Sequence, residues 1–569
     1  MFYHTRILNY FQNRHRGMIL ALLLVVALVY IPYINNPLFF DDLPFFSGTV
    51  NQLISDPWHL YSRWLPYMSL AWTVNAFSDM PLPLHLGNLL LHFANTVLVF
   101  VLLQQLCSLT LNKHHQNTDQ ASNLTTTFPA FFNRTHFFSS PSNWGAWLGA
   151  LAFACHPVAV YAVGYVVERS IVMATFFTLA MQLAYISGLV GNTRLQQAIW
   201  MALSVLFYFC AVFSKEHSLM APALLAAIML LIKPYMNVNW RILTATWLGL
   251  ITVAIFIALR SRGIAATAEH DATALFAQHG IVNATENMHM LSIVTQAGLF
   301  FKYLFLWLLP SPAWMSIDMR EPFTSTVGAW QTWLKLACFT AYGAIALKLL
   351  LKRGKVGLLG FALLYPWLLF FIEFSSVRVQ EPFVLYRSYL WAPGLLLLLP
   401  LALDCLPKRK TVIVILTMMI LVMIPLSWNR LWAFADGYRL WNDAAVLLKN
   451  DFVPGAARIF YNRGNAELNA KKPKEAIADF KRVLAIDPTI YQAHENLGNA
   501  YLGIGQFALG LESYNKSIAL NPKNGSAYFG KAFALKRLNN KTGAVEALTQ
   551  SCELKNVSAC LILTMSGKK

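Results

Sequence analysis

Charged side chains are scarce in this sequence, and acidic side chains are the scarcest. Lys, Arg, Asp and Glu together make up 12% of the 569 residues, whereas hydrophobic residues make up 57%. An average soluble domain carries roughly twice that charged fraction. The first 450 residues hold only 17 Asp and Glu. This composition excludes a soluble or disordered protein for most of the chain, and the long apolar runs predict membrane-spanning helices.

Motifs of several large enzyme classes are also absent. There is no Gly-rich phosphate-binding loop, no His-Glu-x-x-His and no Gly-x-Ser-x-Gly, which excludes ATP-driven machines and hydrolases built on these motifs. Many transporters are built from internal repeats of spans, and the apolar runs of this chain show no clear repeat of that kind. Five of the seven cysteines lie in or beside apolar segments as small core residues. Cys552 and Cys560 lie in the polar C-terminal part, where they could pair in an oxidising compartment.

The apolar runs and the basic loops between them predict a membrane topology. The formal net charge is +18. Much of the basic charge lies between the apolar runs, which indicates topology signals rather than nucleic-acid binding. The basic loops at Arg241 and Lys352 should both be cytoplasmic, so the chain must cross the membrane an even number of times between them. The runs 240–259 and 332–351 already supply two crossings. The apolar segment 291–309 is therefore expected to be re-entrant or to lie along the interface. We expect eleven spans: 18–33, 84–106, 144–163, 171–190, 198–213, 219–232, 240–259, 332–351, 357–372, 389–406 and 411–428.

This topology sorts the polar residues to one side of the membrane. The N-terminus is expected in the cytoplasm, and no small-residue cleavage site follows the first apolar run, which predicts a retained span. The C-terminal part is expected on the outer side of a membrane, such as the periplasmic side of a bacterial inner membrane. The unusual charges near the membrane then fall on the same outer side, in segments 41–42, 156–169, 214–216, 260–322 and 373–387.

The C-terminal part carries an internal repeat. Like residues stand 34 positions apart: Gly464 and Gly498, Phe480 and Tyr514, Pro488 and Pro522. This period and order are typical of tetratricopeptide repeats, in which small residues let paired helices approach closely. We expect an all-α chain in which a membrane helical bundle (1–430) and a connecting segment (431–456) precede a repeat solenoid (457–569). The solenoid has two clear repeats (457–490 and 491–524) and one degenerate repeat (525–558).

Asp41 and Asp42 are the most informative side chains. Two adjacent carboxylates next to an apolar wall are costly unless they are used or paired. They are candidates for a catalytic base in the first outer loop, and the alternative is a helix N-cap or a loop ion pair. Sequence does not assign which of the two would be the base.

A polar stripe lies inside the second predicted span. His85, Asn88, His92 and Asn95 recur at helical spacing, so they share one helix face. Hydrogen bonds between helices are the favoured interpretation, and contact with a phosphate or with the first loop is the alternative. No carboxylate completes a ligand set on this face, so we predict no metal site there.

Charged residues at the boundaries of other spans lie on the same predicted side as the aspartates. Each charge could belong to a structural ion pair or to a site for an anion. Cations at the outer membrane boundary suit a phosphate or pyrophosphate attached to a lipid. The charges concerned are Glu168 and Arg169, Lys215 and Glu216, and the series Glu373, Arg378, Glu381 and Arg387.

At these positions the chain resembles a known group of enzymes. It is similar to the polytopic glycosyltransferases of the GT-C class, and within them to the transmembrane-and-tetratricopeptide O-mannosyltransferases and their bacterial relatives. Ser-Ile-Asp-Met replaces a more usual Asp-Tyr pattern, and Tyr386 stands where a His commonly precedes the Arg. The matching segments are Phe40–Asp42, Arg63–Pro66, His85–His92, Ala154–Val158 with Glu168 and Arg169, Phe213–Glu216, Leu308–Pro312, Ser316–Asp318 and Tyr386–Leu390.

The resemblance implies a function and roles for single residues. A sugar on a polyprenyl phosphate would be transferred, with inversion, to a Ser or Thr hydroxyl of a secreted or membrane protein. Asp41 or Asp42 would be the base, and the repeats would hold the acceptor protein. The donor phosphate would be bound by Arg169, Lys215, Lys302 or Arg387. Supporting polar residues would be Arg63, His85, His92, His156, Glu168, Glu216, Asp318, Glu373, Glu381 and Tyr389.

Two alternatives and the question of cofactors stay open. The acceptor could be a lipid or a glycan, or the chain could be a non-catalytic membrane scaffold with a repeat-based docking domain. No resident cofactor is expected beyond the lipid-linked donor as substrate, and a divalent metal is possible but has no sequence support. The expected partners are membrane lipid, the donor and a protein bound by the repeats, and no nucleic acid.

Overall fold

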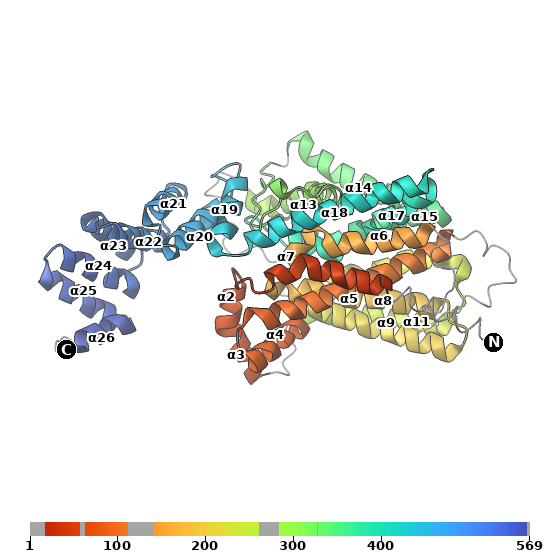
Figure 1. Ribbon diagram of the computed structural model, residues 1–569, viewed down its shortest axis with the longest axis horizontal. Coiled ribbons are helices and arrows are strands. Elements are labelled where there is room, and N and C mark those ends of the chain that lie inside the picture. The colour runs from red at the N-terminus through yellow and green to blue at the C-terminus, as the bar shows by residue number, and fades with distance from the viewer. Residues whose placement is uncertain (1–16, 57–62, 112–140, 261–283, 327, 566–569) are drawn as a thin grey trace. The chain divides into compact units, whose positions relative to one another are not determined.

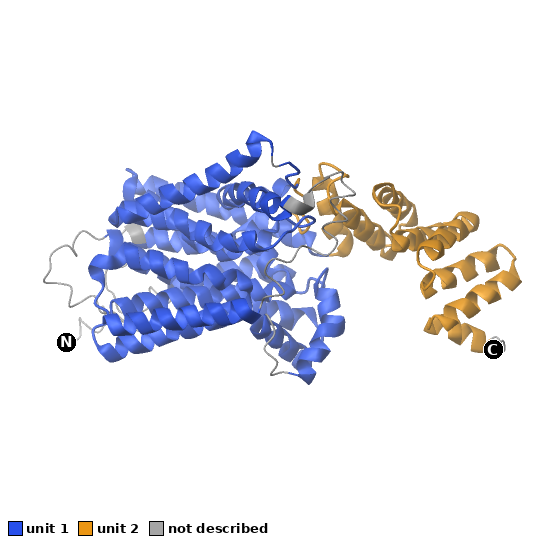
Figure 2. Ribbon diagram, turned by 180° about the vertical axis from the view of Figure 1, so that it is seen from behind, with its two compact units in different colours: residues 1–277, 281–315, 323–435 blue, residues 278–280, 316–322, 436–569 orange. Residues whose placement is uncertain are grey.

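The chain is helical throughout the part that its computed structural model describes, which is residues 17–56, 63–111, 141–260, 284–326 and 328–565. No β-strand is present in these ranges. Arg14, Arg16 and Lys113, which the predicted topology also places in the cytoplasm, lie outside these ranges. Two compact units are formed (Figure 2): unit 1 contains the apolar helices up to Ala435, and unit 2 contains residues 436–569 together with the short segment 316–322. The all-α prediction is confirmed.

Unit 1 consists mainly of long apolar helices. In the described ranges nine helices are long and apolar enough to cross a membrane, or ten if one bent pair counts as a span. Their number and direction in a membrane stay a prediction. The helices are α2 (Asp42–Pro44), α3 (Val50–Ser55), α4 (Trp64–Phe77), α5 (Pro81–Leu111), α6 (Pro141–Cys155), α7 (Val160–Val163), α8 (Arg169–Leu189), α9 (Arg194–Ser214), α10 (Ala221–Ile232), α11 (Trp240–Arg260), α13 (Ala284–Leu308), α14 (Trp330–Leu351), α15 (Gly354–Phe370), α16 (Ala392–Leu395), α17 (Leu398–Cys405) and α18 (Arg409–Ala433).

Prolines break two of the predicted spans. The predicted span 144–163 bends by 46° after Cys155, because His156 is extended and its side chain caps the short turn that begins at Pro157. The predicted span 389–406 is not one helix. Pro393 lies in α16 and Pro400 in α17, and the two helices are short. The sequence signal failed there because mean apolarity does not report breaks in the backbone.

Helix α13 bonds at both ends to the segment that follows α15. Its early residue Ser292 donates to the Ser376 carbonyl at 3.2 Å, and the indole of Trp307 near its other end donates to the Ser388 hydroxyl at 2.9 Å. Both ends therefore contact the segment that follows α15. In Figure 1, α13 is foreshortened, whereas α5, α6, α8 and α18 run lengthwise. The helix is unbroken, and its part 287–308 is long and apolar enough to cross a membrane. Its placement as a re-entrant or interfacial segment stays a prediction.

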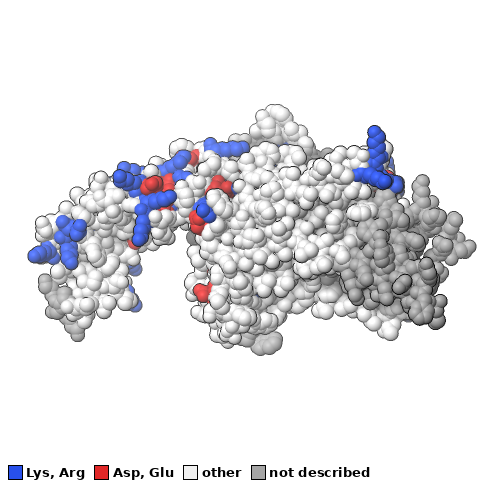
Figure 3. Space-filling model, in the orientation of Figure 1, with Lys and Arg blue, Asp and Glu red and all other residues white. Residues whose placement is uncertain are grey.

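The surface of unit 1 is poor in charge. Figure 3 shows a wide uncharged middle and a group of Lys and Arg over the ends of α15, α17 and α18. Lys408 precedes α18, and Lys355 at this end pairs with Asp404. An uncharged band bounded by basic side chains is the distribution expected for a helical membrane domain.

Unit 2 is a solenoid of helix pairs. Close helix contact explains the predicted repeat, because a Cβ on Gly464 would lie 3.0 Å from the Phe480 ring and one on Gly498 would lie 2.8 Å from the Tyr514 ring. The helices are α19 (Gly437–Leu447), α20 (Ala456–Asn469), α21 (Pro473–Ile486), α22 (Tyr491–Gly503), α23 (Phe507–Leu520), α24 (Gly525–Arg537), α25 (Lys541–Glu553) and α26 (Val557–Met565). A disulfide joins Cys552 of α25 to Cys560 of α26.

Candidate functional site

The two aspartates have different surroundings. Asp42 is 2% exposed, and its carboxylate accepts the Val167 N–H at 2.8 Å and the Phe39 N–H at 3.3 Å. Asp41 is exposed, and its own N–H donates to the Tyr165 hydroxyl at 2.8 Å. Asp42 therefore fastens the first loop to the start of the segment before α8, whereas Asp41 is exposed.

The electrostatics of Asp42 differ from those of an ordinary carboxyl. Burial raises its pKa from 3.8 to about 7, although the two backbone N–H groups act in the opposite direction. A carboxylate whose pKa lies near neutral pH has a basicity that suits a general base. Its oxygens are already engaged by backbone donors, however, so its geometry indicates a positioning role.

Two residues of the candidate site, Phe40 and Arg63, carry backbone strain. Phe40 directly precedes Asp41 and has φ of 54°, and Arg63 has φ of 62° at the start of α4. Non-glycine residues adopt this left-handed conformation rarely, and it clusters at sites where surrounding contacts hold the chain. At Arg63 the holding contact is a two-point bond from Nε and Nη2 to the Glu216 carboxylate, at 3.1 and 2.6 Å.

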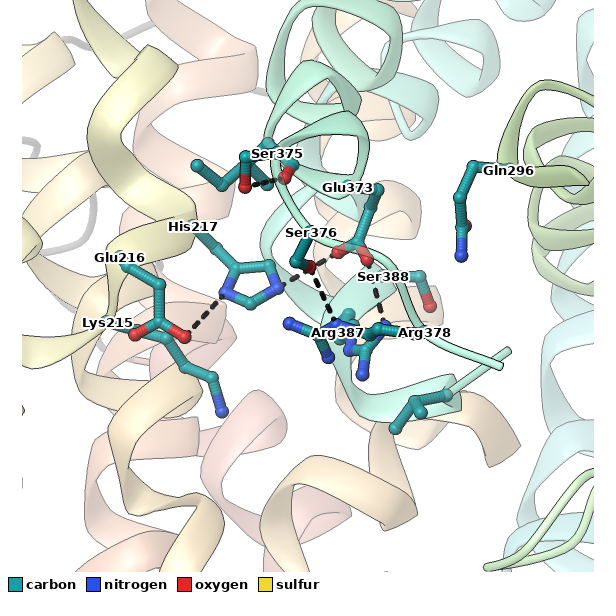
Figure 4. Close-up of polar contacts among 12 residues, drawn as sticks. Lys215, Glu216, His217, Gln296, Glu373, Ser375, Ser376, Arg378, Arg387 and Ser388 are labelled. Carbon is teal, nitrogen blue, oxygen red and sulfur yellow. Dashed lines mark hydrogen bonds and ion pairs between the residues drawn. The ribbon is translucent and has the colours of Figure 1, made fainter. Parts of the chain in front are cut away.

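Glu216 begins a chain of buried and half-buried charges that we name the charge cluster. Figure 4 shows His217 between Glu216 and Glu373. The His217 Nε2 atom lies 2.9 Å from a Glu373 oxygen, and Nδ1 lies 3.7 Å from Glu216. The other Glu373 oxygen accepts from Arg387 at 2.9 Å. The members of the charge cluster are Arg63, Glu168, Lys215, Glu216, His217, Glu373 and Arg387.

The remaining pair of the charge cluster lies beside the aspartate loop. Lys215, which directly follows α9, donates to Glu168 at 2.5 Å and to the Ser170 hydroxyl at 3.2 Å. Lys215 also lies over the Tyr386 ring, 4.7 Å from its centroid. The ring of Tyr386 is 6.3 Å from that of Tyr165, the partner of Asp41. The aspartate loop and the charge cluster are therefore joined through aromatic contacts.

The sequence interpretation missed His217 and Tyr386. His217 follows Lys215 and Glu216 directly in the chain, and its position next to two predicted site residues was the available signal. Tyr386 was noted only as a departure from a family pattern. The contact of each with a charge partner depends on segments far apart in the chain, which a single sequence does not pair.

Arg169 is used inside the protein. It is 3% exposed, and its guanidinium donates to four neutral acceptors: Asn88 Oδ1, Leu84 O, Ser69 Oγ and Thr73 Oγ1. Gly87 leaves room for it, because a Cβ there would lie 2.6 Å from Nη2. The predicted phosphate role is not supported by this geometry, which makes Arg169 a bridge between α4, α5 and α8.

The predicted histidines and Tyr389 bond to other parts of the bundle. His92 lies 2.7 Å from the Tyr389 hydroxyl and 3.1 Å from the Ala154 carbonyl, and His85 lies 3.0 Å from the Asn36 carbonyl. His156 contacts the Trp307 carbonyl at 3.1 Å. The interpretation of the stripe as hydrogen bonding between segments agrees with these contacts. No group of three or more potential metal ligands occurs among the described residues.

Three further predicted residues have contacts of other kinds. Lys302 on α13 lies over the Phe383 ring, 4.6 Å from its centroid. Glu381 acts electrostatically on Tyr386. Asp318 belongs to unit 2, where it accepts from Arg458 of α20 at 2.8 Å and from Arg320 at 2.7 Å. Asp318 therefore fastens segment 316–322 to the first repeat helix.

Comparison with known proteins identifies the C-terminal part. Residues 457–490 and 496–558 match two family models that are both described as tetratricopeptide repeat. This confirms the prediction of repeats, including the degenerate third. Tetratricopeptide repeats form solenoids whose extended surfaces bind other proteins.

Similarities to curated proteins are confined to short stretches. Serine/threonine-protein phosphatase T of Trypanosoma brucei brucei (strain 927/4 GUTat10.1) is 36% identical over 80 residues, which cover 14% of this chain and 17% of that protein. Superkiller complex protein 3 of Homo sapiens is 34% identical over 79 residues, which cover 14% of this chain and 5% of that protein. The chain thus spans a small fraction of the length of these relatives.

Solved structures resemble the chain weakly. A crystal structure of MamA has a TM-score of 0.20 at 21% identity, covering 25% of this chain and 80% of its own. The APC/C hetero-tetramer Cut9-Hcn1 has a TM-score of 0.22 at 13% identity, covering 95% of this chain and 98% of its own. Scores of this size carry no argument about function. The C-terminal tetratricopeptide repeats are the part of the chain that these comparisons identify.

Proposed function

We propose that the chain is an integral-membrane glycosyltransferase that moves a sugar from a polyprenyl-phosphate donor to a Ser or Thr hydroxyl of a protein. The observation that carries the proposal is the joining of an exposed Asp41 to buried cations through Tyr165 and Tyr386. The resemblance to GT-C enzymes supports it, since its segments contribute both aspartates and most of the charge cluster. The repeats would bind the acceptor protein or a partner of it.

Asp41 is the base in this proposal. Its carboxylate takes the proton of the acceptor hydroxyl while the oxygen attacks the anomeric carbon. The bond from that carbon to the donor phosphate breaks, and the electron pair leaves with the phosphate. A positioned base contributes typically ~10²–10⁴-fold in rate. Attack opposite the leaving group without a sugar-enzyme intermediate gives inversion.

Arg387 and Lys215 face the developing phosphate charge in this proposal. Both are buried, and each is held by one carboxylate, Glu373 for Arg387 and Glu168 for Lys215. Fixed cations in a site of low dielectric stabilise charge without reorganising during the reaction. His217 fixes Glu373 from the opposite side, so it acts as a positioning residue.

The test compares the two aspartates. Wild type, Asp41→Asn and Asp42→Asn chains would be expressed in cells that lack the gene, and intact masses of secreted and membrane proteins would be recorded. Loss of a sugar mass with Asp41→Asn, at normal membrane levels of the protein, is the expected result. Asp42→Asn should retain part of the transfer, because it alters positioning rather than proton transfer. Normal sugar masses with Asp41→Asn would refute the role of the base.

A membrane scaffold is the second candidate function. The observation that favours it is the internal pairing of the charge cluster, since buried ion networks also occur for structural reasons. Under this function, removal of 457–569 would reproduce the whole loss of function and Asp41→Asn would be silent. A transfer to a lipid or glycan acceptor would be recognised in the same cells. The lipid or glycan would lose its sugar with Asp41→Asn, and the protein masses would not change.

A further inference from the structure

The segment from the end of the second repeat into the third has an unusual charge distribution. Residues 513–545 contain no Asp or Glu and six Lys or Arg. Figure 3 shows Lys and Arg over α24 and α25 without acidic side chains among them. Helix α24 lies in the middle of this segment. A partner that contacts this part of unit 2 therefore meets one sign of charge.

In the first repeat, carboxylates lie among the cations. Arg463 is bonded to Asp479 at 2.6 Å, Arg458 to Asp318 at 2.8 Å, and Arg482 to Asp451. In segment 513–545, Lys516 pairs with Glu512 just outside it. Three cations of the first repeat are therefore paired within unit 2, whereas segment 513–545 contains no carboxylate of its own that could pair with its cations.

The exposed stripe of α24 combines aromatic rings with two of these cations. Phe529, Phe533, Lys536 and Arg537 follow one another at helical spacing, so they lie on one side of the helix; we name these four the α24 face. The rings of Phe529 and Phe533 meet edge to face at 5.1 Å, and Phe533 is 42% exposed. The Arg537 guanidinium lies over the Phe507 ring at 4.9 Å, which orients it without neutralising it.

Equivalent positions in the other repeats are occupied differently. Asn465 and Asn499 stand 68 and 34 residues before Phe533. Asn465 accepts from Asn496 at 2.7 Å, and Asn499 accepts from Tyr514 at 2.6 Å. These amides bond within unit 2, whereas Phe533 exposes an apolar ring. An aromatic side chain exposed beside cations is a typical anchor of a protein interface.

We propose that the α24 face binds an acidic protein segment that carries an aromatic or aliphatic side chain. The apolar side chain packs on Phe529 and Phe533, and carboxylates contact Lys536 and Arg537. Charge complementarity is the reason for an acidic occupant. A membrane surface is disfavoured, because stable attachment to anionic lipid takes a cluster of about 4–8 cations and this face has two. The proposal depends on the partner-binding role of the repeats and not on the transfer chemistry.

The experiment measures peptide binding to the full chain in detergent micelles. The probe is a short fluorescent peptide of Glu and Asp with two tryptophans, and the controls replace the tryptophans by Ser or the acids by Lys. Binding of the probe should weaken about tenfold with Lys536→Glu/Arg537→Glu, and about tenfold with Phe533→Ser. Lys471→Glu/Lys474→Glu in the first repeat has the same change of charge and should bind as wild type.

Several outcomes would overturn the proposal. Equal binding of the probe and its tryptophan-free or Lys-containing control would remove the specificity. Equal loss in the two charge-reversed variants would show a general charge effect. Binding to vesicles with anionic lipid that depends on Lys536, without peptide binding, would make the face a membrane contact. The Asp41→Asn chain should bind the peptide normally, so a failure here is separate from a failure of the glycosyltransferase proposal.

Discussion

The stability of unit 1 should depend on pH through Asp42. Its pKa is about 7 in the folded chain and 3.8 is its ordinary value. Between about pH 4 and pH 7, the Asp42 carboxyl is therefore protonated in the folded state and ionised in the unfolded state. Stability falls as pH rises through this window, because the folded state then has to carry a buried carboxylate. Replacement of Asp42 by Asn removes this dependence.

The structure gives the size of the effect. The difference between about 7 and 3.8 corresponds to about 4 kcal/mol at ~1.36 kcal/mol per pKa unit. The carboxyl is 2% exposed, so solvent screening reduces this little. The unfolding entropy is ~2.1 cal/mol/K per residue. In a unit of about 400 residues, a change of 1 kcal/mol in the free energy of unfolding therefore shifts the melting temperature by roughly 1 °C. The melting temperature of the Asp42→Asn chain should therefore rise relative to wild type by about 4 °C from low to high pH.

Thermal unfolding in detergent from pH 4.5 to pH 8 measures the difference. The melting temperature of the wild-type chain is subtracted from that of the Asp42→Asn chain at each pH. This difference cancels the contributions of all other groups that titrate in both chains. An amide in place of the carboxylate also meets the Phe39 N–H, which lowers the stability of the variant equally at all pH values. A constant difference across the range would refute the raised pKa. A wild-type chain that gains stability over the variant with rising pH would show that the pKa is lowered.

Three further predictions concern packing and charge. Lys215→Met should destabilise unit 1 by about 3–5 kcal/mol, because it leaves Glu168 buried without its cation, and the melting temperature should recover in part with Glu168→Gln. Gly87→Ala should cost about 1–3 kcal/mol, since its Cβ would lie 2.6 Å from Arg169; unchanged thermal stability would contradict the tight fit. Gly530→Ala would place a Cβ 2.3 Å from a tyrosine ring, so limited proteolysis should cut unit 2 faster, and equal rates would argue against this packing.

Sequence patterns predicted the repeats well, because their signal is local. Gly464 and Phe480 meet across one helix pair, and their spacing recurs at a fixed period. The apolar helices of unit 1 were less predictable. Apolarity marks α5 or α18, but the breaks at Pro157 and Pro393 depend on backbone conformation, so the ends and bends of spans could not be read from composition.

The candidate site was predictable in its residues but not in its pairing. Asp41, Asp42 and most of the charge cluster stand out because charge is scarce in an apolar chain. Their partners come from distant segments: Asp42 bonds to Val167, and Arg63 bonds to Glu216. The different roles of the two aspartates follow only from burial, because neighbouring residues point in different directions and sequence does not report which one is covered.

The buried charge of unit 1 does not balance among the described residues. Four cations and three carboxylates are almost fully buried there: Arg169, Lys215, Arg387 and Arg430 against Asp42, Glu168 and Glu373. Because the pKa of Asp42 is about 7, part of the third carboxylate is protonated near neutral pH, and the positive excess grows. Burying unbalanced charge costs free energy. Arg169 meets this cost with four neutral acceptors and Arg430 with the Met315 carbonyl and the Asn429 side chain. The imbalance is thus explained within the protein, so the proposed anion site rests on Lys215 and Arg387 alone.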